Sequence, residues 1–148
     1  MANKINFEIT TPERVVFSDQ VDEVVLPTMQ GEIGILPNHI PLVSLLSAGE
    51  IRIKKGKEEF FMAVSGGFIE VRPDKVVVLA DTAERAEEID EKRAEEARQR
   101  AQALAHEKRT DAREFAAITA KMEKELARLK VATRRRRRKE PPLRPQSE

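Results

Sequence analysis

The sequence predicts an α+β protein in two parts: an N-terminal β-sandwich of about eight to ten strands, then an antiparallel hairpin of two helices that can also extend. All six glycines and five of the eight prolines fall between Pro12 and Pro73, whereas residues 81–133 contain neither. Glycine and proline mark turns, and their long absence permits helices. Apolar residues in the first part alternate with period two, and in the second they recur at helical spacing.

Strands in the first part are predicted by apolar side chains that alternate with polar ones. This pattern occurs at Ile5, Phe7 and Ile9 and indicates a strand with one buried face. Three continuous, valine-rich runs suggest strands buried on both faces; they are residues 15–17, 24–26 and 76–79. Turn residues recur about every ten positions, a spacing typical of a sandwich or barrel without crossover helices.

Two helices in residues 83–133 are predicted by two apolar stripes at helical spacing. The first stripe is mostly alanine: Ala86, Asp90, Ala94, Ala97, Ala101, Leu104 and Ala105. The second is bulky: Phe115, Ile118, Met122, Leu126 and Leu129. Asp111 is the expected N-cap of the second helix, with Glu114 three residues later. The link at residues 106–110 has no strong helix breaker, so one continuous helix is an open alternative to the hairpin.

Positive charge is concentrated at the C-terminus. The net charge of the chain is +1, yet residues 134–148 carry 7 basic and 2 acidic side chains. The six adjacent cations from Arg134 to Lys139 cannot bury apolar surface, so residues 134–148 are expected to form a disordered basic tail. Such a tail can bind RNA, anionic lipid or an acidic protein surface, and without aromatic residues for base stacking a nonspecific electrostatic role is favoured.

Composition argues against several function classes. The chain has no cysteine, which excludes a disulfide framework, a thiolate zinc site and a cysteine nucleophile. Its longest apolar runs have five residues, far fewer than the roughly 20 that cross a bilayer, and no secretory signal is expected. Two histidines and no recognisable nucleophile arrangement argue against an enzyme. His39, between Pro37 and Pro41, is interpreted as a turn or contact residue rather than a catalytic base.

Charged residues on the expected helices have two interpretations. In a hairpin, Asp90, Arg93, Arg100 and Arg128 would lie on the same few turns, where two or three guanidiniums beside an acid can hold a phosphorylated ligand. The alternative is an i,i+3 salt bridge between Asp90 and Arg93 on a solvated face. The residues by themselves favour the salt bridge.

Three segments and the alanine-rich helices after them resemble the ε subunits of bacterial F-type ATP synthases. The segments are GEIGILPNHIPLVSLLSAGEIRI at 31–53, AVSGGFIEV at 63–71 and VVVLADTAERAEEIDEKRA at 76–94. The resemblance covers about residues 3–133. It implies a non-catalytic central-stalk (rotor) subunit of a proton-translocating ATP synthase. A β-sandwich at residues 1–82 would bind the γ subunit and the c-ring, and a helical hairpin at 83–133 would regulate ATP hydrolysis.

The resemblance also implies site residues. In this family the helices switch between a hairpin and an extended form that inhibits ATP hydrolysis. ATP-sensing members carry Ile/Leu-Asp-x-x-Arg-Ala, and Lys124 stands where such members have an arginine. The implied regulatory ATP site comprises Glu84, Ile89, Asp90, Arg93, Ala94, Arg100 and Arg128. Glu32 and His39 match the contacts with γ and the c-ring, and no other cofactor is implied.

The resemblance therefore predicts a peripheral protein on the cytoplasmic face of the cell membrane, within the ATP synthase complex. Its partners would be the γ subunit, the c-ring and the α and β subunits, without specific nucleic acid binding or direct membrane insertion. The alternative function is an RNA- or membrane-surface-binding adaptor that acts through the arginine-rich tail.

Overall fold

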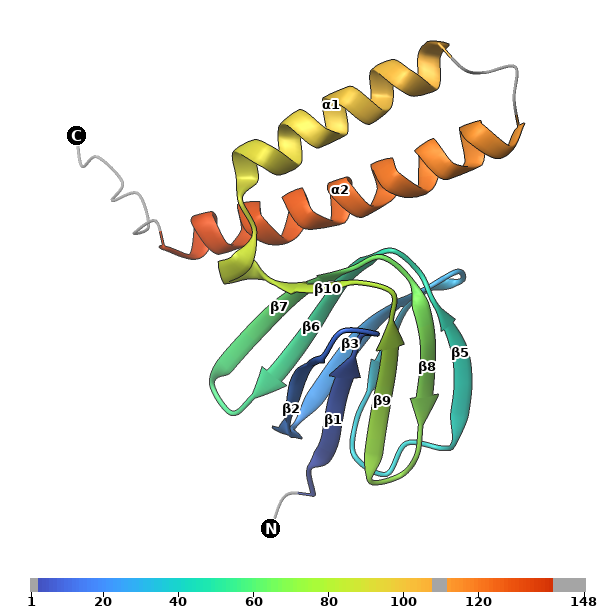
Figure 1. Cartoon of the computed structure of the whole chain (residues 1–148). Coiled ribbons are helices and arrows are strands. Elements are labelled where there is room, and N and C mark those ends of the chain that lie inside the picture. The colour runs from blue at the N-terminus through green and yellow to red at the C-terminus, as the bar shows by residue number, and fades with distance from the viewer. Residues whose placement is uncertain (1–2, 108–111, 140–148) are drawn as a thin grey trace, which may run out of the picture.

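The computed structural model describes residues 3–107 and 112–139. It has two parts: a β-sandwich, and a pair of antiparallel helices packed across one end of it (Figure 1). The strands are β1 (Ile5–Thr10), β2 (Val15–Val21), β3 (Glu23–Thr28), β4 (Gly31–Ile35), β5 (Leu42–Leu46), β6 (Gly49–Lys55), β7 (Glu58–Val64), β8 (Gly67–Val71), β9 (Lys75–Ala80) and β10 (Ala83–Arg85). A 3-10 turn, η1 (Ala86–Glu88), leads to α1 (Glu91–Glu107) and α2 (Ala112–Lys139).

The strands form two layers that are connected by one pairing between strands. One layer has the order β10-β7-β6-β3, with β4 also paired to β3, and the other has the order β5-β8-β9-β1-β2. The layers are joined where β3 pairs with β5, at the single register pair Thr28 and Leu46. Neighbouring strands are antiparallel except β1 and β9. The predicted sandwich and its strand number are confirmed.

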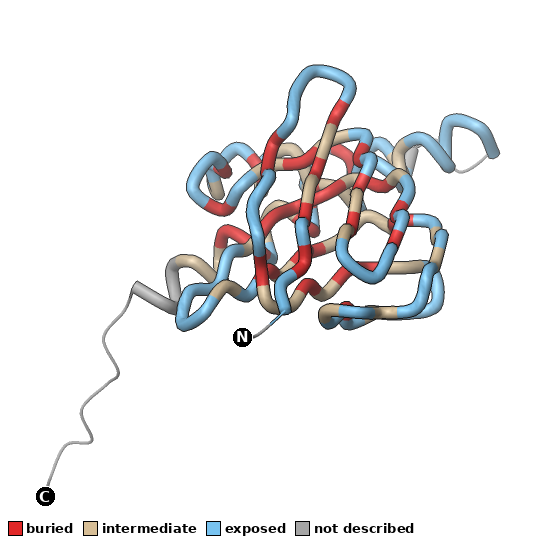
Figure 2. Tube along the Cα trace, turned by 90° about the horizontal axis from the view of Figure 1, so that it is seen from below, coloured by how far each residue is buried: buried red, intermediate tan, exposed pale blue. Residues whose placement is uncertain are grey.

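The core of the sandwich lies between the two layers. Buried and exposed positions alternate along several strands (Figure 2), as period two requires. Ile5, Phe7 and Ile9 on β1 are each 1% exposed or less, and Ile51 and Ile53 on β6 are fully buried. Ile5, Phe7 and Ile9 are the positions at which the sequence predicted a buried strand face.

The helices pack as a hairpin, one of the two arrangements that the sequence left open. Figure 1 shows α1 and α2 antiparallel and side by side, and α2 also contacts β6 and β7. A second apolar cluster joins the helices to η1 and β7; it contains Ala63, Ala86, Ile89, Ala94, Ala127, Val131 and Ala132. Small side chains dominate it and allow close approach.

The expected bulky stripe on the second helix does not form its main buried face. Phe115 is 41% exposed and Leu126 is 46% exposed, whereas Ala127, Val131 and Ala132 are buried. The physical reason is that α2 packs against both α1 and the sandwich, so its buried surface cannot follow one stripe. The expected N-cap Asp111 lies outside the described residues.

Two expected boundaries need correction. Residues 83–85 were assigned to the helical part, but they form β10 and pair with β7, so the sheet extends beyond residue 82. The tail was expected to be disordered from residue 134, but α2 continues to Lys139. Contacts of the first arginines with the rest of the protein explain this continuation. Residues 140–148 of the expected tail lie outside the described residues.

Candidate functional site

One pair from the predicted ATP site is in direct contact. Glu84 on β10 accepts a hydrogen bond from Arg128 on α2, with Nε and Oε2 separated by 2.5 Å. The same arginine donates from Nη1 to Glu125 Oε2 at 2.7 Å. Burial opposes its charge, but hydrogen bonds and attraction from Glu125 and Glu84 raise the pKa of Arg128 above its ordinary value. Arg128 is thus neutralised within the protein by two carboxylates.

The other predicted residues divide between packing and solvent. Ile89 and Ala94 belong to the apolar cluster beneath the helices. Asp90 accepts a hydrogen bond at Oδ1 from the backbone N–H of Arg93 at 3.2 Å, which caps the first turn of α1. Arg93 pairs with Asp90 and Arg100 with Glu96, whereas Arg128 pairs with Glu84 and Glu125.

The side chains of Arg93 and Arg100 point to solvent. They are 83% and 74% exposed, and each forms a long ion pair, Arg93 with the residue that precedes α1 and Arg100 within α1. Arg93 Nε lies 3.8 Å from Asp90 Oδ2, and Arg100 Nη2 lies 3.9 Å from Glu96 Oε2. Exposed pairs of this length contribute little to stability. The two guanidiniums therefore remain available to an external anion.

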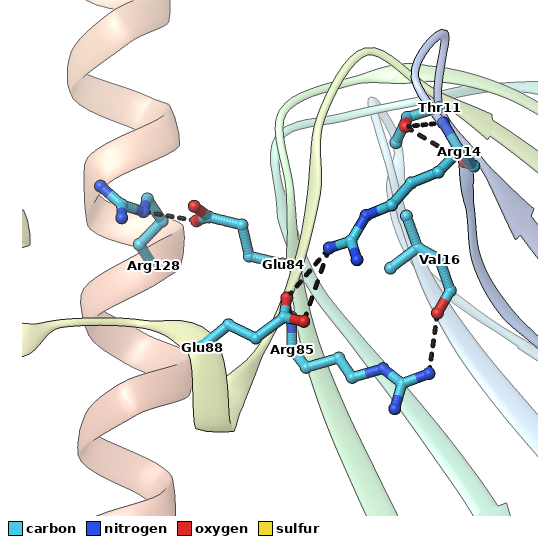
Figure 3. A network of polar contacts seen from close by, with 7 residues as sticks. All are labelled: Thr11, Arg14, Val16, Glu84, Arg85, Glu88 and Arg128. Carbon is cyan, nitrogen blue, oxygen red and sulfur yellow. Dashed lines mark hydrogen bonds and ion pairs between the residues drawn. The ribbon is translucent and has the colours of Figure 1, made fainter.

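The junction between the sandwich and the helices is fastened to β2 (Figure 3). Glu88 in η1 accepts from the Arg14 guanidinium at 3.4 Å and from the backbone N–H of Arg85 at 3.2 Å. Arg85 in turn donates to the carbonyl oxygen of Val16 at 2.8 Å. These contacts hold η1 on the sandwich, and the next residue, Ile89, packs in the apolar cluster beneath the helices.

The predicted contact residues Glu32 and His39 lie on the sandwich. Glu32, on β4, is paired with Arg52 on β6 at 2.8 Å. His39 follows Asn38, whose φ of 63° makes the sharp turn between β4 and β5. The Nδ1 atom of His39 is 2.7 Å from the carbonyl oxygen of Ile40. No described acid or nucleophile shares a hydrogen bond with this ring, and its role as a turn or contact residue stays a prediction.

A row of exposed apolar side chains was missed by the sequence reasoning. Leu45, Phe68 and Leu79 are 54%, 57% and 53% exposed, and they are register partners across β5, β8 and β9. Side chains at such paired positions lie on one face of a sheet. We call these three residues the apolar row. Soluble monomers rarely leave contiguous apolar surface uncovered unless it binds a partner.

The apolar row also corrects a prediction. The runs 15–17 and 76–79 were expected to be buried on both faces, but Val15 is 56% exposed and Leu79 is 53% exposed. A continuous apolar run in a two-layer sandwich has no second layer to cover its outer side. That mismatch was the signal in the sequence that could have located the apolar row.

The fold and the apolar row define a protein-binding subunit with a helical appendage. Two family models match the chain: "ATP synthase, Delta/Epsilon chain, beta-sandwich domain" over residues 4–86 and "ATP synthase, Delta/Epsilon chain, long alpha-helix domain" over residues 87–133. The chain belongs to the ATP synthase delta/epsilon chain family. The boundary between the two matches assigns β10 to the sandwich, as its pairing with β7 does.

Similar proteins include ATP synthase epsilon chains from several bacteria. The chain is 52% identical to that of Dehalococcoides mccartyi over 134 residues, which are 90% of this chain and 96% of the relative. It is 51% identical to that of Chloroflexus aggregans over 128 residues, covering 86% and 91%. A chain in the cryo-EM structure of the Euglena gracilis mitochondrial ATP synthase (OSCP/F1/c-ring) has the same fold. Its TM-score is 0.77 at 23% identity, covering 90% of this chain and 83% of that one.

Within residues 3–107 and 112–139, no group of three or more histidine, aspartate or glutamate side chains is placed to hold a metal ion. No helix in the same ranges is long and apolar enough to cross a membrane.

Proposed function

We propose that this chain is the ε subunit in the central stalk of a proton-translocating F-type ATP synthase, where it is not itself an enzyme. The observation that carries the proposal is the apolar row on a sandwich of this family. The row would bind the γ subunit, and Glu32 and His39 would lie at the contacts with γ and the c-ring. The chain would then be a peripheral protein at the cytoplasmic face, held there by its partners.

The helix pair would regulate hydrolysis of ATP by the α and β subunits. In the hairpin, α2 lies on the sandwich, and an extended form would instead reach toward the catalytic hexamer. The ties of Glu88 to Arg14 and Arg85 favour a swing that begins after η1. A ligand shifts such an equilibrium only through its different affinity for the two states.

The regulatory role predicts a difference between two forms of the protein. We expect the full-length chain to lower the ATPase rate of the γ-containing hexamer, and a form that ends at Glu88 to lose this effect. The shortened form should retain γ binding, because β10 and the apolar row remain. An end at Ala80 would be a poorer test, since it removes the strand that pairs with β7. Equal ATPase rates with both forms bound would contradict inhibition by the helices.

We also propose that ATP is the regulatory ligand, bound through Arg93 and Arg100. Their exposure and long ion pairs support this, because a phosphate offers shorter, charge-assisted hydrogen bonds. Arg128 would join only if Glu84 or Glu125 released it. No second cofactor is part of the proposal.

The ATP site predicts saturable binding to the isolated protein that is weakened by mutation. The double change Arg93→Gln and Arg100→Gln removes two charge-assisted contacts and should raise the Kd for ATP at least about tenfold. Arg98→Gln is the matched control, because Arg98 lies on the same helix but is held by Glu95 at 2.7 Å. Calorimetric titration with ATP measures the Kd of the original chain, the double variant and the Arg98→Gln control. Absence of saturable binding up to millimolar ATP would exclude the site.

The adaptor alternative receives no support. Arg134 and Arg135, the first residues of the expected RNA- or membrane-binding tail, contact Glu50 and the carbonyl oxygen of Ala86 within the protein. The family matches cover residues 4–133 and account for the fold without such a role.

A further inference from the structure

A buried carboxylate lies beneath α2, outside the sites considered above. The side chain of Glu50, on β6, is only 1% exposed. Its Oε1 lies 3.1 Å from Arg134 Nη1 on α2, and neither carboxylate oxygen has a hydrogen-bond partner among the described residues. A buried charge is costly unless it is paired. Docking of α2 buries the Glu50 carboxylate, and Arg134 on the same helix supplies the positive charge that compensates it.

Arg134 makes a second contact in the same place. Its guanidinium carbon lies 5.0 Å from the centre of the Phe61 ring on β7, a cation–π geometry. The arginine is 37% exposed, so its outer side still meets water while its inner side is held by Glu50 and Phe61. The helical family match ends at residue 133, so this contact comes from the first residue beyond that match.

Glu50 and Glu84 lie on one row across the sandwich. Glu50 is the register partner of Ala63, and Ala63 is the register partner of Glu84, so the three side chains share the face that α2 covers. Two strand spacings place the backbones of Glu50 and Glu84 roughly 9.6 Å apart. Their partners Arg134 and Arg128 are six residues apart on α2, a rise of about 9 Å. The rise along the helix axis between the two arginines thus matches the distance between the two acidic residues across the strands, and the small residue Ala63 lies between those acids.

We propose that Glu50 and Arg134 form a latch that, together with Glu84 and Arg128, holds α2 on the sandwich in one register. When α2 lifts, water hydrates both partners of the latch. When α2 is docked without the arginine, Glu50 is buried as an unpaired charge. Arg134, the first arginine of the basic segment, therefore sets the equilibrium between the docked and the lifted helix pair. The latch belongs to the isolated chain, and only its effect on hydrolysis rests on the proposed function.

The absence of native cysteine allows a direct test in the full-length protein. Ala63 is 3% exposed and lies beside Glu50, so a thiol in the Ala63→Cys background reacts with dithiobisnitrobenzoate only when the helices lift. In that background, Arg134→Gln should raise the labelling rate at least about tenfold, because a docked helix then buries an unpaired carboxylate. Arg135→Gln, which removes only a 3.4 Å contact to a backbone carbonyl, should change it less than about twofold.

The decisive comparison is the double variant. Glu50→Gln alone should have the smaller effect, since the partly exposed arginine keeps contact with water. Adding Glu50→Gln to Arg134→Gln should return the labelling rate to within about threefold of the Ala63→Cys protein. If Arg134 acts only through packing of its stem, the double variant will label as fast as Arg134→Gln, and the latch is refuted. The rate of amide hydrogen exchange in α2 provides a second measurement. It can be made on the same Glu50 and Arg134 variants without the Ala63→Cys change, because it needs no thiol.

The pH dependence has a defined sign. Burial raises the pKa of Glu50, against the attraction of Arg134 and Lys130 on α2 and of Arg52 on β6, while Glu32 on β4 adds repulsion. A carboxyl whose pKa is higher in the docked state binds a proton more readily there, so docking strengthens as pH falls through that pKa. The labelling rate, corrected for thiol ionisation, should therefore fall toward acid pH, and the Glu50→Gln variants should lack this change. Equal pH profiles with and without Glu50 would overturn the assignment.

Discussion

Replacing Gly67 with alanine is expected to destabilise the β-sandwich by more than about 3 kcal/mol, a loss reserved for severe structural conflicts. Gly67 begins β8 with a φ of 139°, which L side chains rarely adopt, and an added Cβ would lie 1.9 Å from the carbonyl oxygen of Leu79. That oxygen belongs to β9, the antiparallel neighbour of β8. Because backbone rather than a flexible side chain blocks the space, relief requires the two strands to separate.

Two other glycines provide graded controls. Gly66 has a φ of 126°, but its added Cβ would meet nothing nearer than 3.5 Å, so Gly66→Ala should cost only the backbone strain of about 1–3 kcal/mol. Gly34 has neither a left-handed φ nor an atom within 4 Å of the added Cβ, and Gly34→Ala should stay within about 1 kcal/mol of the original. Urea denaturation measures the free energy of unfolding for each. Equal losses for Gly66→Ala and Gly67→Ala would show that the clash has no role.

Replacing Phe68 with aspartate is expected to weaken binding to the γ subunit at least about 100-fold, equivalent to about 2.7 kcal/mol. Phe68 is the centre of the apolar row, between Leu45 and Leu79. A carboxylate there would lose its water on binding without gaining a partner. Because Phe68 is 57% exposed in the isolated chain, folding should be little affected, and the loss should appear in association alone.

The control for Phe68 is an exposed apolar residue on the helices. Leu104 on α1 is 43% exposed, and Leu104→Asp introduces the same charge far from the apolar row. Affinity for purified γ, measured by surface plasmon resonance, should be unchanged for Leu104→Asp and greatly reduced for Phe68→Asp. Undiminished γ binding by Phe68→Asp, with the fold verified by circular dichroism, would remove the apolar row as the interface.

Local patterns predicted the sandwich well because its strands depend on alternation and turn residues. Ile5, Phe7 and Ile9 are buried as their spacing requires. The prediction that the runs 15–17 and 76–79 are buried on both faces was wrong, because an apolar run does not by itself indicate whether a second layer covers it. The buried face of α2 was misread for a related reason: its packing against both α1 and the sandwich is not encoded in one helical stripe.

Two contacts among the residues of the predicted ATP site are present in the structure, while ATP binding itself stays a prediction. The pairing of Glu84 with Arg128 realises one contact of the predicted group, and the Asp90 to Arg93 contact also forms. The ion pair of Arg100 lies within α1, whereas Arg128 pairs with Glu84 on β10 and with Glu125 on α2. Glu50 carried no signal in the sequence, because an acidic residue in a strand is ordinarily exposed. Its partner lies 84 positions away, in a segment that composition alone assigned to a solvated tail.

By itself, the sequence determined the two-part architecture, the strand-rich first part, the breaker-free helical part and the family to which the chain belongs. These properties depend on local spacing and on segments that can be compared directly. Only the tertiary structure decided the rest: the hairpin, the uncovered apolar row and the match between two arginines of α2 and two carboxylates of the sandwich. The physical reason is that burial and ion pairing depend on which distant surfaces meet, and local spacing does not specify that.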